Sequence, residues 1–270
     1  MEPSIKTIQR LIETFVRDYK NRPSIRSNWK TPLVAVADAV DPLFRELKRV
    51  VGPTHRVPHD LLAGAKSVIT FFVPFDHRIP KSNRDGRFSS KKWAQAYIET
   101  NLLITELSRF LVQKTEEMGY IATTIPPTHN FDKLKLLSDW SHKHVTYIAG
   151  LGDFGLHQML ITEKGCCGRL GSLVTTLPLE PTKRPEKPFC LYRANQRCQQ
   201  CVNQCVFGAL EIGKLDRHRC YEICIENDQY HRELGSTDIC GKCACGIPCS
   251  FTNPVKDRKG GPCPPRLTHS

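Results

Sequence analysis

Apolar residues recur at helical spacing in two stretches of the first half of the chain. Residues 5–19 carry an apolar position every third or fourth residue, which predicts an amphipathic helix that ends before Pro23. A longer stripe over residues 93–118 predicts a second helix, with Gly119 as its C-terminal cap. Both helices are expected to belong to the scaffold.

Continuous apolar runs alternate with these helices and are typical of buried strands. They cover residues 33–40 and 67–73, and two more follow at 158–162 and 170–177. Residues 131–148 predict one more helix. Helices and strands interleave without a regular βαβ period, so we expect an α+β fold rather than a doubly wound one.

Composition and charge limit the classes of protein to which this chain can belong. A chain of 270 residues with 40% hydrophobic content can bury its own core. Its net charge of +12 favours an acidic partner, which would be RNA, an anionic cofactor or an acidic electron-transfer protein. No aromatic-interleaved motif supports RNA binding.

The first twenty residues contain no apolar segment of the kind that directs export. The most apolar stretch, residues 68–75, is too short to cross a bilayer. We therefore expect a cytoplasmic protein without a membrane segment.

The thirteen cysteines are concentrated in the second half of the chain. None precedes Cys166, and most lie between Cys190 and Cys249. Because the chain can form its own core and lacks an export signal, these thiols are interpreted as metal ligands rather than disulfides. A proline-rich linker separates them from the rest, which predicts a first domain at 1–187, a cysteine-rich domain at 188–253 and a basic flexible tail at 254–270.

One cysteine run resembles that of bacterial ferredoxins. Cys198, Cys201 and Cys205 are separated by two and three residues, but Asn195 occupies the place of the usual first cysteine. Cys190 must then supply the missing thiolate through a longer loop.

A second group of six cysteines lies between residues 220 and 249, so the chain offers more thiols than the eight that two [4Fe-4S] clusters need. Cys224 and Cys245 are the expected spare thiols, although Cys224 stays an alternative to Cys220. The crossed ligand pattern of ferredoxins assigns Cys190, Cys198, Cys201 and Cys249 to one cluster and Cys205, Cys220, Cys240 and Cys243 to the other.

A zinc site is the alternative to iron. Cys198 and Cys201 with Cys240 and Cys243 would make a tetrahedral four-thiolate site. A zinc site of this kind would not use Cys249 as a ligand, whereas two iron–sulfur clusters would.

Four segments together resemble the epoxyqueuosine reductase and reductive dehalogenase superfamily. The similarity is to a short epoxyqueuosine reductase-like branch without C-terminal helical repeats, and it rests on residues 61–69, 149–155, 198–210 and 240–249. The resemblance implies a nitroreductase-like module that binds a corrinoid, followed by a ferredoxin-like module with two [4Fe-4S] clusters. It also implies a low-potential electron donor, such as ferredoxin or flavodoxin, and a small or nucleoside-like substrate.

Within that resemblance, the glycine-rich loop and the following strand would lie against the corrinoid. The residues concerned are Gly150, Gly152, Gly155 and Leu160. Glycine suits this place because only its backbone admits so large a ring closely. A flavin in the same domain is the alternative cofactor.

Three polar residues before the glycine loop are candidate proton donors, namely Asp139, His142 and His144. The acidic residue of the resembling enzymes does not align on Asp139. Tyr97 and Tyr147 are weaker candidates, since a tyrosine in a helix usually packs.

The vicinal pair Cys166 and Cys167 stands outside both cysteine groups. Lys164 and Arg169 flank it and are expected to lower a thiol pKa, which would suit a redox or ligand role. The alternative is a loop that simply packs against a neighbouring element.

Two main functions follow from these features. The first is an enzyme, an iron–sulfur reductase that passes electrons through two clusters to a corrinoid. The second is an electron carrier or activase that reduces the corrinoid or flavin of a partner. An RNA-binding module that holds zinc is the third, and positive charge is its only support.

Overall fold

The computed structural model describes residues 3–127 and 131–256. The chain forms two compact units, and both are discontinuous in sequence. Unit 1 comprises Met1–Asp76, Gln95–Leu151 and Gly168–Pro185, and unit 2 comprises His77–Ala94, Gly152–Cys167 and Glu186–Ser270. Most of the predicted basic tail at 254–270 lies outside the described residues.

Unit 1 is built on a four-stranded antiparallel sheet. Its strand order is β1-β2-β8-β3, with β1 at Leu33–Asp38, β2 at Ser67–Pro74, β8 at Gly168–Thr175 and β3 at Ala122–Thr124. Every residue of β2 is buried, because this strand pairs on both edges and is covered on both faces. This burial on both faces explains why the sequence of β2 is a continuous apolar run.

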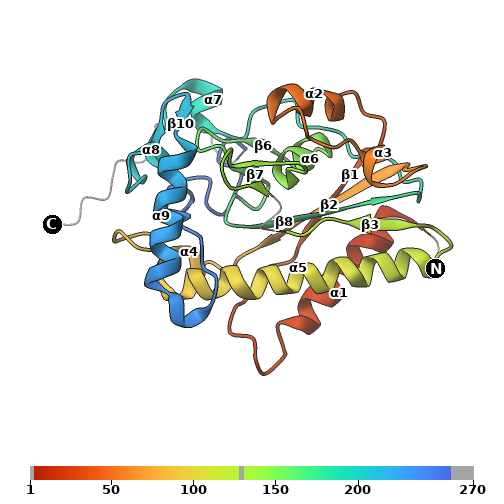
Figure 1. Cartoon of the computed structure of the whole chain (residues 1–270), viewed down its shortest axis with the longest axis horizontal. Helices are drawn as coiled ribbons and strands as arrows, with labels where there is room; N and C mark the ends of the chain where they lie inside the picture. Colours follow the sequence, from red (N-terminus) through yellow and green to blue (C-terminus); the bar gives the residue numbers. More distant parts are fainter. Residues whose placement is uncertain (1–2, 128–130, 257–270) are drawn as a thin grey trace. The chain divides into compact units, whose positions relative to one another are not determined.

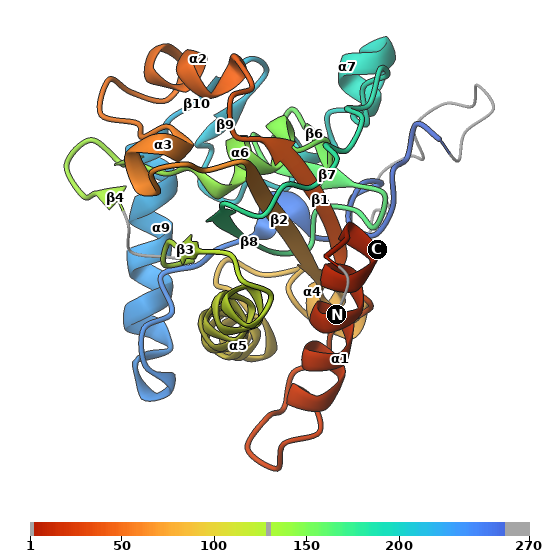
Figure 2. The same cartoon turned by 90° about the vertical axis from the view of Figure 1, so that its right-hand side faces the viewer.

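Helices cover the two faces of this sheet (Figure 1, Figure 2). On one face lie α1 at Ile5–Tyr19 and the unit 1 part of α5, which runs from Lys91 to Glu117. On the other face lie α2 at Leu43–Val50, α3 at Pro58–Leu61 and α6 at His142–Ile148. The mixed α and β character predicted from the sequence is confirmed.

The helix predicted at the start of the chain is also confirmed. The Ser4 hydroxyl accepts a hydrogen bond from the Thr7 backbone N–H and so begins α1. The apolar stripe is buried at Ile8, Ile12 and Val16. Packing of this stripe, more than intrinsic propensity, stabilises a helix of this length.

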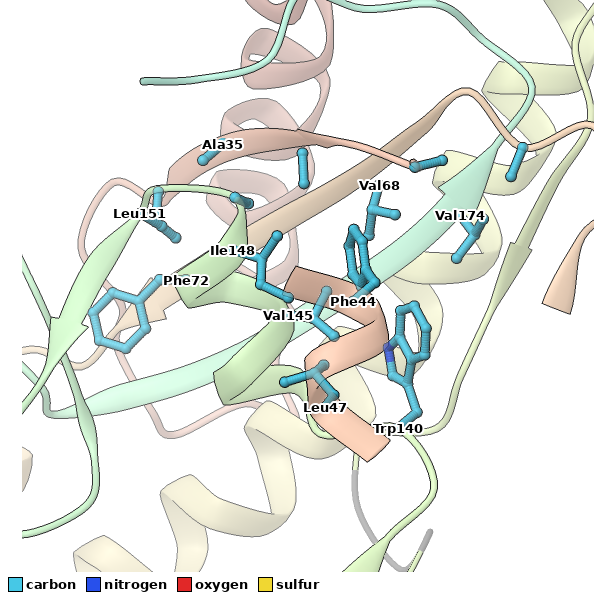
Figure 3. Close-up of a cluster of buried hydrophobic side chains, with 14 residues drawn as sticks. Ala35, Phe44, Leu47, Val68, Phe72, Trp140, Val145, Ile148, Leu151 and Val174 are labelled. Atoms are coloured by element: carbon cyan, nitrogen blue, oxygen red, sulfur yellow. The ribbon is translucent and has the colours of Figure 1, made fainter. Parts of the chain in front are cut away.

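A hydrophobic cluster fills the space between the sheet and α2 and α6 (Figure 3). Phe44 and Trp140 are stacked there with ring centroids 6.3 Å apart. The Trp140 indole N–H is not left unsatisfied, since it donates to the Ser172 hydroxyl at 2.9 Å. This cluster therefore fixes Asp139, just before α6, and the start of α6, which carries His142 and His144.

The single helix predicted over residues 131–148 is wrong in its first half. Two short strands, β4 at Phe131–Asp132 and β5 at Leu137–Ser138, pair with each other before α6 begins. The Asp132 carboxylate accepts the backbone N–H groups of Leu134 and Lys135 at 2.8 and 3.0 Å. Such a local turn competes with a helix for the same backbone donors.

Unit 2 consists of short elements and two small sheets. One sheet pairs β6 with β7 and the other pairs β9 with β10. Its longest complete helix is α9, which the Asp216 carboxylate caps by accepting from the Arg219 N–H. The elements are α4 at Arg78–Ser82, β6 at Gly152–Phe154, β7 at Leu160–Thr162, α7 at Leu191–Asn195, α8 at Gln200–Asn203, β9 at Leu210–Glu211, β10 at Lys214–Leu215, α9 at Arg217–Tyr230, and 3-10 turns at Arg232–Leu234 and Lys242–Ala244.

Within the described part of the chain, no helix combines the length and the apolar character needed to cross a membrane.

Candidate iron–sulfur site

Four thiols line one small cavity of unit 2. Cys190 immediately precedes α7, Cys201 lies in α8, and Cys198 and Cys249 lie in loops. These four are the residues that the sequence assigned to one cluster, and Leu156, Leu191 and Ile247 complete the apolar wall. Burial, followed by the charges of Cys249, Cys190 and Cys198, raises the pKa of Cys201 to about 12.

A second set of four thiols is also gathered in unit 2. Burial, together with the neighbouring thiols Cys220 and Cys205, raises the pKa of Cys240 to about 11. Burial likewise raises the pKa of Cys243, followed by the effects of Cys240, Cys220 and Cys205. The structure thus brings together the four cysteines that the sequence assigned to the second cluster.

The two sets are close to each other. Cys201 of the first set is among the thiols that raise the pKa of Cys243 in the second set. Each set offers four soft sulfur donors, the number and type that a [4Fe-4S] cluster requires. The donor chemistry therefore fits two clusters, while the ligand assignment itself stays a prediction.

Cys224 lies one helical turn after Cys220 on α9. Its thiol donates to the Cys220 backbone carbonyl at 3.4 Å. Its pKa is raised, first by a hydrogen bond to the Cys220 thiol and then by burial. Both thiols therefore lie on one face of the helix, and Cys224 remains the alternative ligand on this element.

A buried lysine accompanies the second set. Lys242 is almost fully buried, and its ammonium donates to the Asp85 backbone carbonyl at 2.6 Å. Burial lowers its pKa, whereas Cys240 and Cys245 raise it. A cation at this place would offset part of the negative charge of thiolates. Sequence reasoning did not single out Lys242, although its position between Cys240 and Cys243 was the available signal.

The vicinal pair Cys166 and Cys167 is buried against the last cysteine loop. Both thiols point to the Ala244 carbonyl, at 3.8 and 3.1 Å, and the Cys166 N–H donates to the Cys249 carbonyl at 2.9 Å. Hydrogen bonding to Cys167 raises the pKa of Cys166, and burial raises that of Cys167. The expectation that flanking Lys164 and Arg169 lower a thiol pKa here is therefore wrong.

The glycine-rich loop is filled by the chain itself. A side chain at Gly150 would contact the backbone of residues 182–184 at 3.0 to 3.1 Å, and one at Gly152 would overlap the Ile161 carbonyl. At Gly155 it would overlap the His157 ring. These three glycines are thus required by packing and show no open cradle for a ring, and Leu160 is buried in β7. Corrinoid contact at these residues stays a prediction.

Asp139 lines a separate cavity of about 730 Å³ in unit 1. Its carboxylate accepts a hydrogen bond from the Thr54 hydroxyl at 2.6 Å, and its backbone carbonyl accepts from the Arg56 N–H. Lys133 and Lys135 also line the cavity. The lining carries three cationic residues, Arg56, Lys133 and Lys135, against the two carboxylates of Asp132 and Asp139, and this excess of positive charge suits a ligand with anionic groups.

The other predicted proton donors are engaged in hydrogen bonds within unit 1. His142 Nε2 donates to the Pro126 carbonyl at 3.0 Å, and its Nδ1 accepts from the Ser172 hydroxyl at 2.9 Å. Burial lowers the pKa of His142 to about 4, so the ring is neutral at pH 7. His144 Nδ1 lies 2.7 Å from the Ser141 hydroxyl.

The two tyrosines that were weaker candidates have packing partners. The Arg169 guanidinium lies 4.5 Å from the Tyr97 ring centroid, and Tyr147 packs on the hydrophobic cluster. Of all the candidate donors, Asp139 is the one that lines the large cavity of unit 1.

Solved structures show where this fold occurs. An epoxyqueuosine reductase from Bacillus subtilis is 19% identical with a TM-score of 0.51, and it matches over 87% of this chain and 64% of its own. One from Streptococcus thermophilus is 14% identical with a TM-score of 0.52 over 97% of this chain and 69% of its own. A reductive dehalogenase described as B12-dependent is 16% identical with a TM-score of 0.55 over 78% of this chain and 29% of its own.

The chain therefore has the fold of epoxyqueuosine reductases and reductive dehalogenases, as the sequence resemblance implied. It spans about 64% of the length of the first epoxyqueuosine reductases that it matches. No protein-family model matches the sequence, and neither does any curated protein.

Proposed function

We propose that this protein is an iron–sulfur oxidoreductase in which eight cysteines of unit 2 hold two [4Fe-4S] clusters. The observation that carries the proposal is the small cavity lined by Cys190, Cys198, Cys201 and Cys249, with a second set of four thiols close to it. When bound, such clusters accept and pass on single electrons. The residues of the chain supply soft thiolates, an apolar wall and, at Lys242, a buried cation.

The clusters are proposed to pass their electrons to a corrinoid. The corrinoid would then reduce a small or nucleoside-like substrate. Support comes from the fold, because one similar structure is a B12-dependent dehalogenase and another holds an epoxyqueuosine-modified tRNA stem loop. Asp139, whose carboxylate accepts a hydrogen bond from the Thr54 hydroxyl, is the residue proposed to donate a proton to the substrate. The cationic residues Arg56, Lys133 and Lys135 would bind the anionic groups of a ligand in the same cavity.

An electron carrier or activase is the second candidate, which would reduce the corrinoid or flavin of a partner. The filled glycine loop favours it, because a Cβ at Gly150, Gly152 or Gly155 already meets atoms of the chain. In either case the net charge of +12 suits an acidic low-potential donor of the ferredoxin or flavodoxin kind.

Metal content and cobalamin uptake test these proposals together. The full chain is purified without oxygen, and iron, sulfide, zinc and cobalt are measured before and after incubation with cobalamin. About eight irons per chain are expected, since two cubes require that number. Stoichiometric cobalt would support the corrinoid reductase, whereas clusters without cobalt uptake would favour the carrier. Zinc in place of iron would contradict both and favour the zinc-binding alternative.

A further inference from the structure

The loop between β6 and β7 turns one imidazole into the interior of unit 2. The Gly155 N–H donates to the Met159 carbonyl at 2.9 Å, and the Gln158 N–H donates to the Gly155 carbonyl at 3.1 Å. Gln158 adopts a φ of +63°, a left-handed conformation that non-glycine residues rarely take. This tight turn directs the His157 ring inward, where the residue is 3% exposed.

The ring lies directly on a glycine. A side chain at Gly155 would overlap the Cε1 and Nδ1 atoms of His157. Gly155 therefore provides the space that the imidazole occupies. Packing of this ring is a reason for glycine at position 155, and the predicted cofactor contact there stays a prediction.

Hydrogen bonding fixes which ring nitrogen carries the proton. The Met159 backbone N–H, which can only donate, lies 3.1 Å from His157 Nδ1. Nδ1 therefore accepts, and in the neutral ring the proton is on Nε2. Nε2 lies 3.5 Å from the Sγ atom of Cys249, one of the four cysteines that line the small cavity. The ring thus presents an N–H group to a sulfur atom in a buried environment.

We propose that His157 is a tuning residue, whose Nε2–H donates a hydrogen bond to the Cys249 thiolate and raises the reduction potential of the cluster that this cysteine holds. The inference rests on the proposed function. Reduction adds negative charge to a cluster and its sulfur ligands, so a hydrogen bond to one sulfur stabilises the reduced state more than the oxidised state. Because His157 and Cys249 are both buried, a hydrogen bond between them is stronger than it would be in water.

Direct metal binding by His157 is the competing interpretation. The ligand atoms of His157, Cys166 and Cys249 lie within 4.8 Å of one another. Binding through Nε2 would require that this nitrogen lose its proton, since Nδ1 already accepts from the backbone. It would also compete with the three other cysteines around the cavity for Cys249.

Redox titrations of the iron-loaded full chain, monitored by electron paramagnetic resonance, test the proposal. His157→Phe keeps a ring on Gly155 without a donor, and His157→Gln keeps an N–H donor without the ring. We expect His157→Phe to lower the equilibrium constant for reduction of one cluster about tenfold, which is ~59 mV for one electron. The other cluster should be unchanged, and His157→Gln should recover part of the shift.

The iron and sulfide content of the wild-type protein tests the proposed function. This measurement does not depend on the role of His157. If two clusters are present, unchanged potentials in an iron-replete His157→Phe would overturn the tuning role. Equal shifts in both variants would also overturn it, because they would indicate packing rather than a hydrogen bond.

If His157→Phe fails to bind iron, the wild-type protein still gives an answer. Pulsed electron paramagnetic resonance of the reduced protein, labelled with ¹⁵N-histidine, should show one weakly coupled nitrogen. A strong coupling would identify His157 as a ligand, and the absence of any coupling would show that no imidazole approaches a cluster. Both results would contradict the proposal.

Discussion

Cys243 and Cys245 are separated by one residue, yet they have different neighbours. The pKa of Cys243 is raised by burial and by Cys240, Cys220 and Cys205. The Cys245 thiol is fully buried and lies 3.5 Å from the Asn83 amide nitrogen. Spacing alone proposed this division, because two residues between cysteines let one loop wrap a corner of a cluster.

We predict that Cys243→Ser loses about half of the iron, because it opens one of two cubes. The matched control is Cys245→Ser, which should keep nearly all of it. Iron and sulfide per chain, measured after reconstitution without oxygen, check both variants. Equal losses would overturn the ligand assignment.

His142 predicts a pH dependence of stability in unit 1. Its pKa in the folded protein is about 4, below the ordinary value near 6.5, because the ring is buried between the Ser172 hydroxyl and the Pro126 carbonyl. Between these two values the unfolded chain binds more protons than the folded one. Stability is therefore full above pH 6.5 and falls as the pH drops toward 4.

The predicted loss is on the order of 2 to 3 kcal/mol, since each pH unit between about 6.5 and 4.5 contributes about 1.4 kcal/mol. Urea unfolding at pH 7.5 and pH 4.5 measures it. His142→Gln removes the titrating group, so its stability should fall less between the two pH values. The same decline in both proteins would assign the effect to other residues, such as His55.

His157 shows what the sequence could not reveal at the residue scale. Nothing in its local sequence distinguishes it from a surface histidine. Its relevance depends on a tight turn and on Cys249, which lies 92 residues away in the chain. Lys242 does have a local signal, because it lies within the cysteine run itself.

At the scale of elements, one glycine of β8 carries a packing prediction. Gly171 is paired with Phe71 of β2, and a side chain there would overlap the Phe71 ring. Gly171→Ala should therefore destabilise unit 1 by about 1–3 kcal/mol through overpacking. Gly52→Ala is the control, because its Cβ would meet only Leu137 at 3.4 Å. Urea unfolding of both variants provides the measurement, and equal stabilities would contradict the packing argument.

Elements with a strong apolar pattern were predictable from the sequence. The first helix and the runs that form β1, β2 and β8 follow from periodicity, because each buries a continuous face. The segment at 131–148 was not predictable in this way. Its apolar residues suit a helix, but the Asp132 side chain closes a turn that ends in Leu136 with a φ of +52°.

At the scale of the whole molecule, the domains predicted from the sequence and the compact units differ in their bounds. The sequence separates the chain near residue 187, whereas packing also assigns residues 77–94 and 152–167 to unit 2. Contacts within that unit explain the first addition, since the Asn83 side chain donates to the Cys240 carbonyl at 2.9 Å. Such long-range contacts leave no periodic signal in the sequence.

The two units differ in what can hold them folded. Unit 1 has a four-stranded sheet and a large hydrophobic cluster. The described residues of unit 2 form two-stranded sheets and mostly short helices around its thiols. Because metal binding and folding are coupled where the hydrophobic core is small, iron is expected to stabilise unit 2 more than unit 1.

Removing iron should therefore loosen unit 2 while unit 1 stays folded. Hydrogen exchange, followed by mass spectrometry on the loaded protein and after chelation under reducing conditions, resolves the two. Peptides from α7, α8 and α9 should lose protection, whereas β1, β2 and β8 should keep theirs, since their stability comes from apolar burial. Cys243→Ser should give an intermediate pattern within unit 2. Loss of protection in both units together would mean that they fold as one cooperative body, and unchanged protection in unit 2 would mean that its scaffold needs no cluster.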